Sequence, residues 1–301
     1  MSKTIKQLLQ FNNKIDRLDA ELLIAYVLGK SREFVLAHLD FEVGRLKDYK
    51  IKRLFKKRAK GIPLAYLTGH KEFFGLDFFV NKNVLVPRPD TEILVEEVLS
   101  HITYHITHNK PITFIDVGTG SGCIPISITK TLENENTKTF AIDISRKALR
   151  VARKNAKKHH VKASLSSAHV AGQIKFLHGN LLSPFINLKP ILSKTQNLII
   201  TANLPYITEE QFKTEPSIHH EPRLALVAKN KGLALYEELL EQIRQFYSLF
   251  LIPYSLFMEI DPSQSQSIKP LIKKYLPKAK IEIKKDLAGL DRVVVIEIKS
   301  K

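Results

Sequence analysis

The spacing of apolar residues divides the chain into two parts. Over residues 1–70, apolar positions recur three and four residues apart, which predicts short helices that each bury one face. Leu22 and Val27 belong to one such helix, which Gly29 can end, and Ser31 can cap the next. A third helix carries Lys and Arg on its outer face. Because three short helices bury little surface by themselves, we expect a small helical domain that leans on a larger one.

Residues 71–88 follow a different pattern. Aromatic and β-branched side chains dominate residues 72–86, and turn-forming residues interrupt them at 75–77 and 81–83. Strand-forming residues on both sides of a tight turn predict a β-hairpin. We expect residues 71–88 to form a hairpin linker between the helical domain and the rest of the chain.

Apolar strand segments alternate with helical segments from residue 89 to residue 301. Strands are expected at 112–117, 139–143, 173–178, 197–202, 255–260, 280–285 and 291–298. Helices are expected at 91–102, from 122 onward, and at 146–158, 231–251 and 263–275. This alternation predicts an α/β domain whose mostly parallel sheet is covered on both faces. The turn at 287–290 is too short for a parallel crossover, so the last two strands should be antiparallel. The polar residues 157–172 should form a loop.

Composition and charge add constraints on location and partners. A chain of 301 residues, 44% of them hydrophobic, can hold one large α/β domain and one small domain. Cys123 is the only cysteine, and no uncharged apolar stretch reaches membrane-spanning length, so we expect a soluble cytoplasmic protein. The net charge of +17 favours nucleic acid, a ribosome-associated partner or an acidic protein surface. The lysines are scattered along the chain, however, which fits a solvated surface equally well.

A glycine-rich turn follows the strand at 112–117. It reads Gly118-Thr119-Gly120-Ser121-Gly122 and a helix follows directly, which suits a nucleotide-like ligand at a strand end. A dinucleotide site would have its third glycine one residue later. Asp116 would repel a pyrophosphate but can bind a cationic amino-acid group, and Asp143 at the next strand end can accept both ribose hydroxyls. These features favour S-adenosylmethionine over NAD as the cofactor.

The strand at 197–202 ends in Asn203-Leu204-Pro205-Tyr206. This tetrapeptide resembles the Asn-Pro-Pro-Tyr motif of methyltransferases that act on amide or exocyclic amino nitrogens. An amide nitrogen is a poor nucleophile because its lone pair is delocalised into the carbonyl group. The Asn203 side-chain oxygen and the Leu204 carbonyl can accept its two N–H groups and hold it in line with a methyl group. Leu204 replaces a proline of the motif, but its carbonyl is still backbone, and Pro205 keeps it extended. Tyr206 can stack on the planar target.

Four further segments carry motifs at matching spacings, at residues 65–73 (AYLTGHKEF), 86–92 (VPRPDTE), 221–226 (EPRLAL) and 285–292 (KDLAGLDR). They resemble signatures of the peptide chain release factor glutamine methyltransferases, the HemK/PrmC family, and the resemblance spans about residues 15–298. It implies a seven-stranded, Rossmann-like S-adenosylmethionine-dependent methyltransferase domain, preceded by a small helical bundle and a β-hairpin linker. It also implies that the chain methylates the glutamine side-chain nitrogen in the Gly-Gly-Gln motif of release factors.

The resemblance also implies residue roles. The glycine-rich turn would hold the methionine half of the cofactor, Asn180 and Leu181 would flank its adenine, and residues 87–92 would lie over the pocket. In that last segment Asp90 or Thr91 can also cap the following helix. The predicted cofactor-binding residues are Asp116, Gly118, Thr119, Gly120, Ser121, Gly122, Asp143, Asn180, Leu181 and Asn203, and the predicted catalytic residues are Asn203, Leu204, Pro205 and Tyr206. Residues 1–70 would dock the release factor, because a single glutamine offers little surface for selectivity.

Two other functions stay open at this point. An adenine-N6 or cytosine-N4 nucleic-acid methyltransferase would use the same tetrapeptide on a flipped base, although no target-recognition domain is evident. A ribosome-binding protein that has lost catalysis is the third hypothesis.

We expect no metal, because His101, His105 and His108 share a helix face without a Cys or acidic pair to complete a site. We also expect a monomer that needs neither membrane nor nucleic acid.

Overall fold

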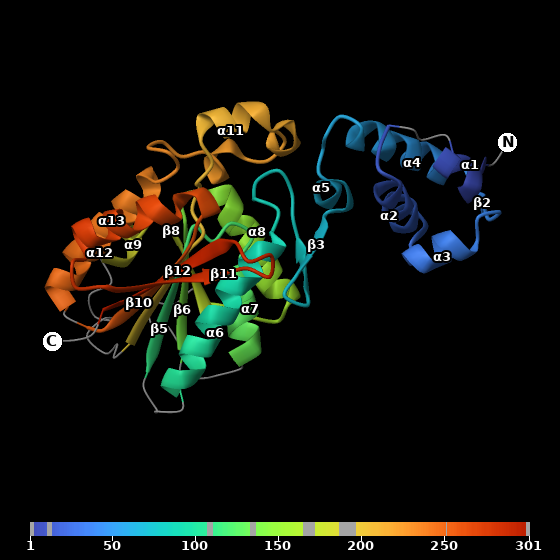
Figure 1. Cartoon of the computed structure of the whole chain (residues 1–301). Helices are drawn as coiled ribbons and strands as arrows, with labels where there is room; N and C mark the ends of the chain where they lie inside the picture. The colour runs from blue at the N-terminus through green and yellow to red at the C-terminus, as the bar shows by residue number, and fades with distance from the viewer. Residues whose placement is uncertain are drawn as a thin grey trace. The chain divides into compact units, whose positions relative to one another are not determined.

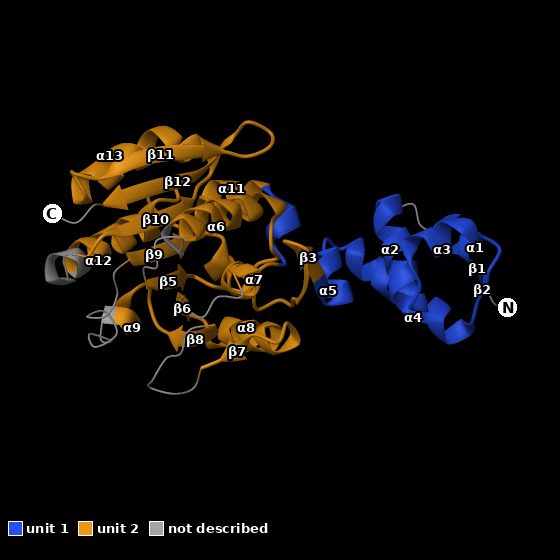
Figure 2. Cartoon of the chain, turned by 90° about the horizontal axis from the view of Figure 1, so that it is seen from below, with its two compact units in different colours: residues 1–70, 215–220 blue, residues 71–214, 221–301 orange. Residues whose placement is uncertain are grey.

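The chain forms two compact units in a computed structural model that describes residues 3–10, 14–106, 111–132, 137–164, 172–186, 197–250 and 252–298 (Figure 1). One unit comprises residues 1–70 together with 215–220, and the other comprises residues 71–214 and 221–301 (Figure 2). Each unit has a hydrophobic core of its own.

The smaller unit is helical. Its helices are α1 (Ile5–Gln10), α2 (Arg17–Leu28), α3 (Arg32–Ala37), α4 (Arg45–Arg58) and α5 (Leu64–Thr68), beside a two-residue antiparallel ladder of β1 (Lys3–Thr4) and β2 (Glu42–Val43). The Asp16 carboxylate caps α2 by accepting the Leu18 N–H, and Gly29 ends this helix with a φ of 68°. The three predicted helices correspond to α2, α3 and α4. Helices α1 and α5 have six and five residues, too few for a helical period to show in the sequence.

The hairpin of β3 (His70–Phe73) and β4 (Leu76–Phe79) turns at Phe74 and Gly75, which both have positive φ. The Asn155 side chain anchors it, because its amide donates to the Phe79 carbonyl at 3.0 Å and accepts the Phe79 N–H at 2.8 Å. Phe73 and Phe78 are fully buried in the core of the larger unit. Most of the hairpin is therefore packed as a part of that unit.

An eight-stranded sheet forms the centre of the larger unit. Its strands are β5 (Ile112–Val117), β6 (Thr137–Asp143), β7 (Lys162–Ala163), β8 (Gln173–His178), β9 (Asn197–Ala202), β10 (Tyr254–Glu259), β11 (Lys280–Lys285) and β12 (Asp291–Ile298). They lie in the order β11-β12-β10-β9-β5-β6-β8-β7. All pairs from β10 to β7 are parallel, whereas β12 is antiparallel to both β10 and β11, as the short turn between the last two strands predicts.

The expected number of seven strands is wrong by one. The extra strand is β7, a two-residue edge strand that pairs with β8 inside the polar segment 157–172. Edge strands of this kind are short and polar, because one side of the backbone faces solvent, so no apolar run marks β7 in the sequence. The predicted loop is partly helix α8 and partly β7, and its residues 165–171 lie outside the described ranges.

Helices cover both faces of the sheet (Figure 1). Alternate residues of β5 belong to two different core clusters, Ile115 and Val117 to one, Ile112 and Phe114 to the other. The first cluster packs against α9 (Ser183–Ile186), α12 (Ala234–Phe250) and α13 (Ser265–Tyr275). The second packs against α6 (Glu92–Ile106), α7 (Cys123–Leu132) and α8 (Arg146–Lys158). The predicted two-sided α/β architecture is confirmed.

Short helical turns connect the remaining elements of the larger unit. They are η1 (Pro89–Thr91), α11 (Glu209–Thr214), η3 (Arg223–Ala225) and η4 (Pro262–Gln264), while η2 (Pro216–Ile218) belongs to the helical unit. Among the described residues, no helix combines the length and the apolar character that crossing a bilayer requires.

Candidate active site

A cavity of about 180 Å³ lies at the carboxyl ends of the parallel strands β5, β6, β8 and β9, within the larger unit. Open α/β sheets bind their ligands at this edge. Ten of the predicted site residues line it: Gly118, Thr119, Gly120, Ser121, Asp143, Asn180, Leu181, Asn203, Leu204 and Pro205. Pro87, Arg88 and Thr91 also line it. Asp116, Gly122 and Tyr206 are not among the lining residues.

The glycine-rich turn forms part of the cavity lining. Gly118, Gly120 and Gly122 have φ values of 78°, 54° and 81°, which L side chains rarely adopt. The N–H groups of Gly118 and Thr119 both donate to the Ile142 carbonyl at 2.9 Å, so the turn is fixed to the end of β6. A Cβ at Gly118 would lie 3.1 Å from the Leu204 side chain. The turn therefore needs glycine both for its backbone shape and for its closeness to the tetrapeptide.

Asp143 at the end of β6 holds this turn from the other side. Its Oδ2 accepts the Gly120 N–H at 2.8 Å, and its Oδ1 accepts the Ser145 N–H at 2.7 Å. Burial raises the pKa of Asp143, and these two backbone N–H groups offset part of the rise. Each carboxylate oxygen keeps a lone pair for a further donor, such as a ligand hydroxyl at the cavity wall.

Asp116 lies in β5, just before the turn, and is not among the residues that line the cavity. It is fully buried, and desolvation raises the pKa of its carboxyl to about 6. Thr201 donates to its Oδ1 at 2.8 Å, whereas Oδ2 has no hydrogen-bond partner in the described part of the chain. A buried carboxylate with an unsatisfied oxygen favours positive charge nearby. This fits the cationic methionine half of S-adenosylmethionine and disfavours a pyrophosphate.

Asn180 and Leu181 line the cavity at the end of β8. The Asn180 side-chain amide donates to Glu238 on α12, which fixes its orientation. Leu181 is buried with a φ of 47°, an uncommon backbone conformation for a leucine. Strained residues of this kind often lie at ligand-binding sites.

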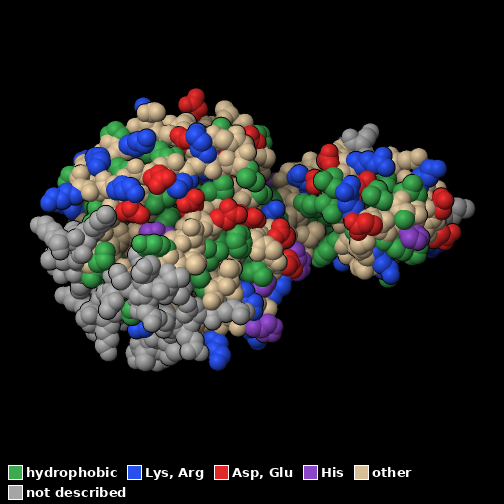
Figure 3. Space-filling view, turned by 60° about the horizontal axis from the view of Figure 1, so that its bottom comes forward, with side chains coloured by type: hydrophobic (Ala, Val, Ile, Leu, Met, Phe, Trp, Pro, Cys, Tyr) green, Lys and Arg blue, Asp and Glu red, His purple; other side chains and the backbone are tan. Residues whose placement is uncertain are grey.

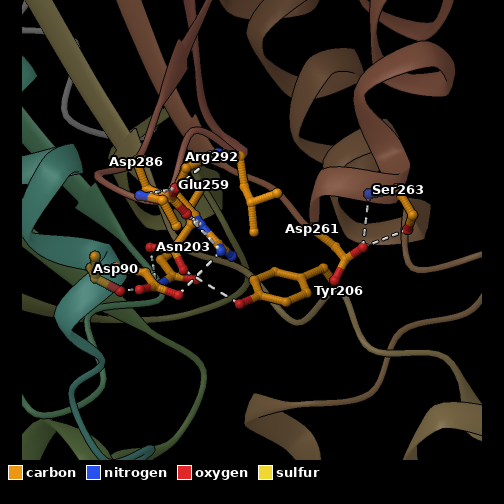
Figure 4. A network of polar contacts seen from close by, with 11 residues as sticks. Asp90, Asn203, Tyr206, Glu259, Asp261, Ser263, Asp286 and Arg292 are labelled. Atoms are coloured by element: carbon orange, nitrogen blue, oxygen red, sulfur yellow. Dashed lines mark hydrogen bonds and ion pairs between the residues drawn. The ribbon is translucent and has the colours of Figure 1, made fainter.

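Asn203 is held by two side chains that come from distant parts of the sequence. Its Nδ2 donates to Thr91 Oγ1 at 3.1 Å and to Glu259 Oε2 at 2.9 Å (Figure 4). Both hydrogens of the amide are therefore used inside the protein, and within the described residues Asn203 Oδ1 accepts no hydrogen bond. The acceptor end of the side chain is left for a ligand in the cavity that Asn203 lines.

Leu204 and Tyr206 differ in their surroundings. The N–H and the carbonyl oxygen of Leu204 both lie 3.4 Å from the hydroxyl of the fully buried Tyr236. That hydroxyl makes a shorter bond to the Glu259 carbonyl, so the Leu204 carbonyl keeps a lone pair for a ligand. Tyr206 directs its hydroxyl to Glu259 Oε1 at 3.4 Å (Figure 4), and burial raises its pKa. Tyr206 is not among the residues that line the cavity, so its stacking on the target stays a prediction.

Sequence reasoning missed Glu259, Thr91 and Tyr236. Glu259 ends β10, just as Asp143 ends β6, so a polar residue at a strand's carboxyl end was a usable indication. Thr91 was expected to lie over the pocket or to cap the following helix, and its bond to Asn203 was not foreseen, because its Oγ1 accepts the Asn203 amide. Asp90, the other proposed cap, forms an ion pair with Arg292 at 3.2 Å.

No group of three or more His, Cys, Asp or Glu side chains in the described ranges is arranged to hold a metal ion. His101 contacts Ser255 Oγ through its Nε2 at 2.8 Å. The side chain of His105 and the whole of His108 lie outside the described residues.

Comparisons with known proteins match both parts of the chain. Residues 2–69 match the family model of the PrmC N-terminal domain, and residues 108–172 match a methyltransferase domain. The release factor glutamine methyltransferase of Bacillus anthracis is 34% identical over 298 residues, covering 98% of this chain and 97% of the relative. That of Bacillus subtilis (strain 168) is 34% identical over 279 residues, covering 91% and 89%. Among solved structures, the catalytic domain of hMettl16 in complex with a MAT2A 3′UTR hairpin has a TM-score of 0.53 at 15% identity and covers 92% of both chains, a likeness of fold.

Proposed function

Because this chain belongs to the family of release factor glutamine methyltransferases, we propose that it methylates the glutamine side-chain nitrogen in the Gly-Gly-Gln motif of peptide chain release factors, with S-adenosylmethionine as methyl donor. One structural observation supports the proposal independently of the sequence similarity. Asn203 uses both amide hydrogens on Thr91 and Glu259, so its oxygen is the end that a substrate amide meets. Asn203 and Leu204 line the same cavity as the glycine-rich turn.

The chain's task is to make an unreactive amide nitrogen attack a carbon atom. The cofactor supplies a methyl group activated by a sulfonium centre. Asn203 Oδ1 and the Leu204 carbonyl accept the two N–H groups of the substrate glutamine and aim its nitrogen at that carbon. When bound, the cofactor would give up this methyl group and leave as the neutral thioether, and the methylated nitrogen would carry a positive charge until it releases one proton to water. Asn203 Oδ1 and the Leu204 carbonyl would stabilise that charge through their hydrogen bonds, so positioning and electrostatics supply the catalysis.

Binding of the cofactor falls to the turn and the strand ends around it. The backbone of Gly118–Gly122 holds the methionine half, and buried Asp116 attracts its positive charge through the turn. Asp143 accepts from the ribose hydroxyls with the lone pairs that Gly120 and Ser145 leave free. Asn180 and Leu181 flank the adenine at the end of β8.

Recognition of the release factor is assigned to the helical unit of residues 1–70. In α4 the buried residues are Ile51, Leu54 and Phe55. The lysines and arginines of this helix therefore lie on its outer face, where a partner protein can contact them. Over the larger unit, Lys and Arg side chains on the face shown in Figure 3 are interspersed with Asp and Glu. The proposed setting is the cytoplasm, with the chain acting as a monomer and without nucleic acid.

A transfer assay tests this function. Labelled S-adenosylmethionine is incubated with the chain and, in separate reactions, with purified release factor, with DNA and with RNA. We expect label on the release factor and its loss when alanine replaces the glutamine of the Gly-Gly-Gln motif. Label on DNA or RNA alone would support the nucleic-acid methyltransferase instead. Cofactor binding without transfer to any of them would favour a protein that has lost catalysis.

A further inference from the structure

Glu259 is a buried acid next to the residue that meets the substrate. It ends β10, is 1% exposed, and touches the proposed acceptor Asn203 without lining the cavity itself. Tyr206 donates to its other carboxylate oxygen (Figure 4). Tyr236 donates to its backbone carbonyl. A group so placed cannot touch the substrate, but it can decide how Asn203 does.

We propose, building on the function above, that Glu259 is a positioning residue whose ionised carboxylate determines which end of the Asn203 amide faces the substrate. An ionised carboxylate only accepts hydrogen bonds, so it attracts Nδ2 and repels Oδ1. With Nδ2 held inside, Oδ1 faces the cavity and can accept the glutamine N–H. The negative charge also polarises the Asn203 amide and makes Oδ1 a stronger acceptor.

Protonation of Glu259 removes this selection. The neutral carboxyl has an O–H that can donate to Asn203 Oδ1. This bond stabilises the flipped Asn203 side chain, in which Oδ1 and Nδ2 have exchanged places. In that orientation the Asn203 NH₂ group would face the substrate NH₂ group, donor against donor. Methyl transfer should therefore need Glu259 in its ionised form.

The surroundings of Glu259 bring its titration close to neutrality. Burial raises the pKa of its carboxyl to about 7, while Thr91 and Arg292 oppose the rise. Arg292 opposes it only in part, because its guanidinium is already paired with Asp286 at 3.0 Å and Asp90 at 3.2 Å. The titratable groups that act on Glu259 are Asp90 from η1, Cys123 from α7, Tyr206 from the loop after β9, Tyr236 from α12 and Arg292 from β12.

The sign of the pH dependence follows from the ionised form being active. Transfer should be lost as pH falls through the Glu259 pKa of about 7 and should level off above it. Asp116, with a pKa of about 6, acts on the cofactor side. Measuring kcat at saturating cofactor separates the two acids.

The experiment compares Glu259→Gln with the full-length parent over about pH 5.5 to 8.5, on both sides of the titration. Gln keeps the volume, but its amide accommodates either orientation of Asn203 and never carries charge. We expect kcat above the titration to fall about tenfold, as for hydrogen-bond partners of ligating groups, and the step in kcat near pH 7 to disappear. The dissociation constant for S-adenosylmethionine and the unfolding temperature should stay close to those of the parent.

Glu237→Gln is the matched control. Glu237 is a carboxylate on α12 that binds Lys274 Nζ at 2.9 Å and Tyr275 Oη at 3.0 Å, away from the cavity lining. This variant should keep the parental pH profile. A Glu259→Gln enzyme with parental kcat and an unchanged profile would overturn the inference.

Two outcomes separate this inference from the proposed function. If the parent labels no release factor at any pH, the proposed function itself fails. If the parent labels the release factor but its kcat is flat across pH 7, the role of Glu259 fails while the function stands. This second outcome is measured on the parent enzyme alone, so it tests the role of Glu259 even if the Glu259→Gln variant does not fold.

Discussion

The two sides of the cavity are held together by different kinds of hydrogen bond. On the β5–β6 side, backbone N–H groups of the glycine-rich turn donate to the Ile142 carbonyl and to Asp143, partners within about one βα unit. On the β9–β10 side, Asn203 is held by the side chains of Thr91 and Glu259, which lie 112 and 56 residues away in the sequence. The first side depends on backbone shape, and the second depends on the identity of a few remote side chains.

Each side also contains a buried acid, and the acids act differently. Asp116 does not line the cavity and affects a ligand through its charge, with one oxygen lacking a partner in the described chain. Glu259 has hydrogen bonds to Asn203 and Tyr206 and affects a ligand through the orientation of a neighbour. Binding of a cation tolerates a distant charge, whereas aiming an amide nitrogen requires hydrogen bonds of fixed direction.

Asn203→Ala should have the largest effect, because it removes the acceptor itself. We expect kcat to fall about 100-fold to 1000-fold, as for other groups that stabilise developing charge. The dissociation constant for S-adenosylmethionine, measured by calorimetry, should change little. Turnover close to that of the parent would show that the β9–β10 side does not hold the reacting amide.

Asp143→Asn should have an intermediate effect, confined to the cofactor side. Asn has a single acceptor oxygen, so it cannot accept both the Gly120 and Ser145 N–H groups that Asp143 accepts now. Hydrogen bonds to charged groups contribute about 1.5–3 kcal/mol, so cofactor affinity should fall about tenfold to a hundredfold. The kcat at saturating cofactor should fall much less. Equal losses in cofactor affinity and kcat would contradict the assignment of the β5–β6 side to cofactor binding and of the β9–β10 side to the reacting amide.

Gly122→Ala should have the smallest effect on chemistry and act on stability instead. Its φ is 81°, and an added Cβ would lie 3.0 Å from Ile126 Cδ1 and 3.1 Å from Ala152 Cβ. The backbone conformation costs about 1–2 kcal/mol, and overpacking adds about 1 kcal/mol or more.

Gly120→Ala provides the control for that prediction. Gly120 also has a positive φ, of 54°, but the nearest atom to an added Cβ is 3.9 Å away. Only the backbone cost should then appear in urea unfolding. If both variants lost the same stability, close packing of the turn against α7 and α8 would not matter.

The cofactor side could be found in the sequence because its residues are close together in the chain. Strand β5 and the turn after it are contiguous, and β5 has the bounds that its apolar run predicts. Parallel packing then brings the end of β6, with Asp143, beside it. The same logic places Asn203 at the next strand end, since β9 pairs with β5.

The side chains that fix Asn203 could not be found in the same way. Thr91 precedes α6 and suits a helix cap, and Glu259 is one acid among many in a charged chain. The stacking role of Tyr206 stays a prediction, because the sequence does not show which way a ring turns at the end of a strand.

The sequence by itself determined the order of the longer strands and helices, the glycine backbone of the turn and the carboxyl edge where the cavity forms. These follow from local periodicity and from the steric freedom of glycine, which act over a few residues. Tertiary structure alone decided the neighbours of Asn203, the extra edge strand and the pKa of Glu259. Burial and hydrogen-bond direction depend on which distant segments meet, and strand pairing with its core packing settles that.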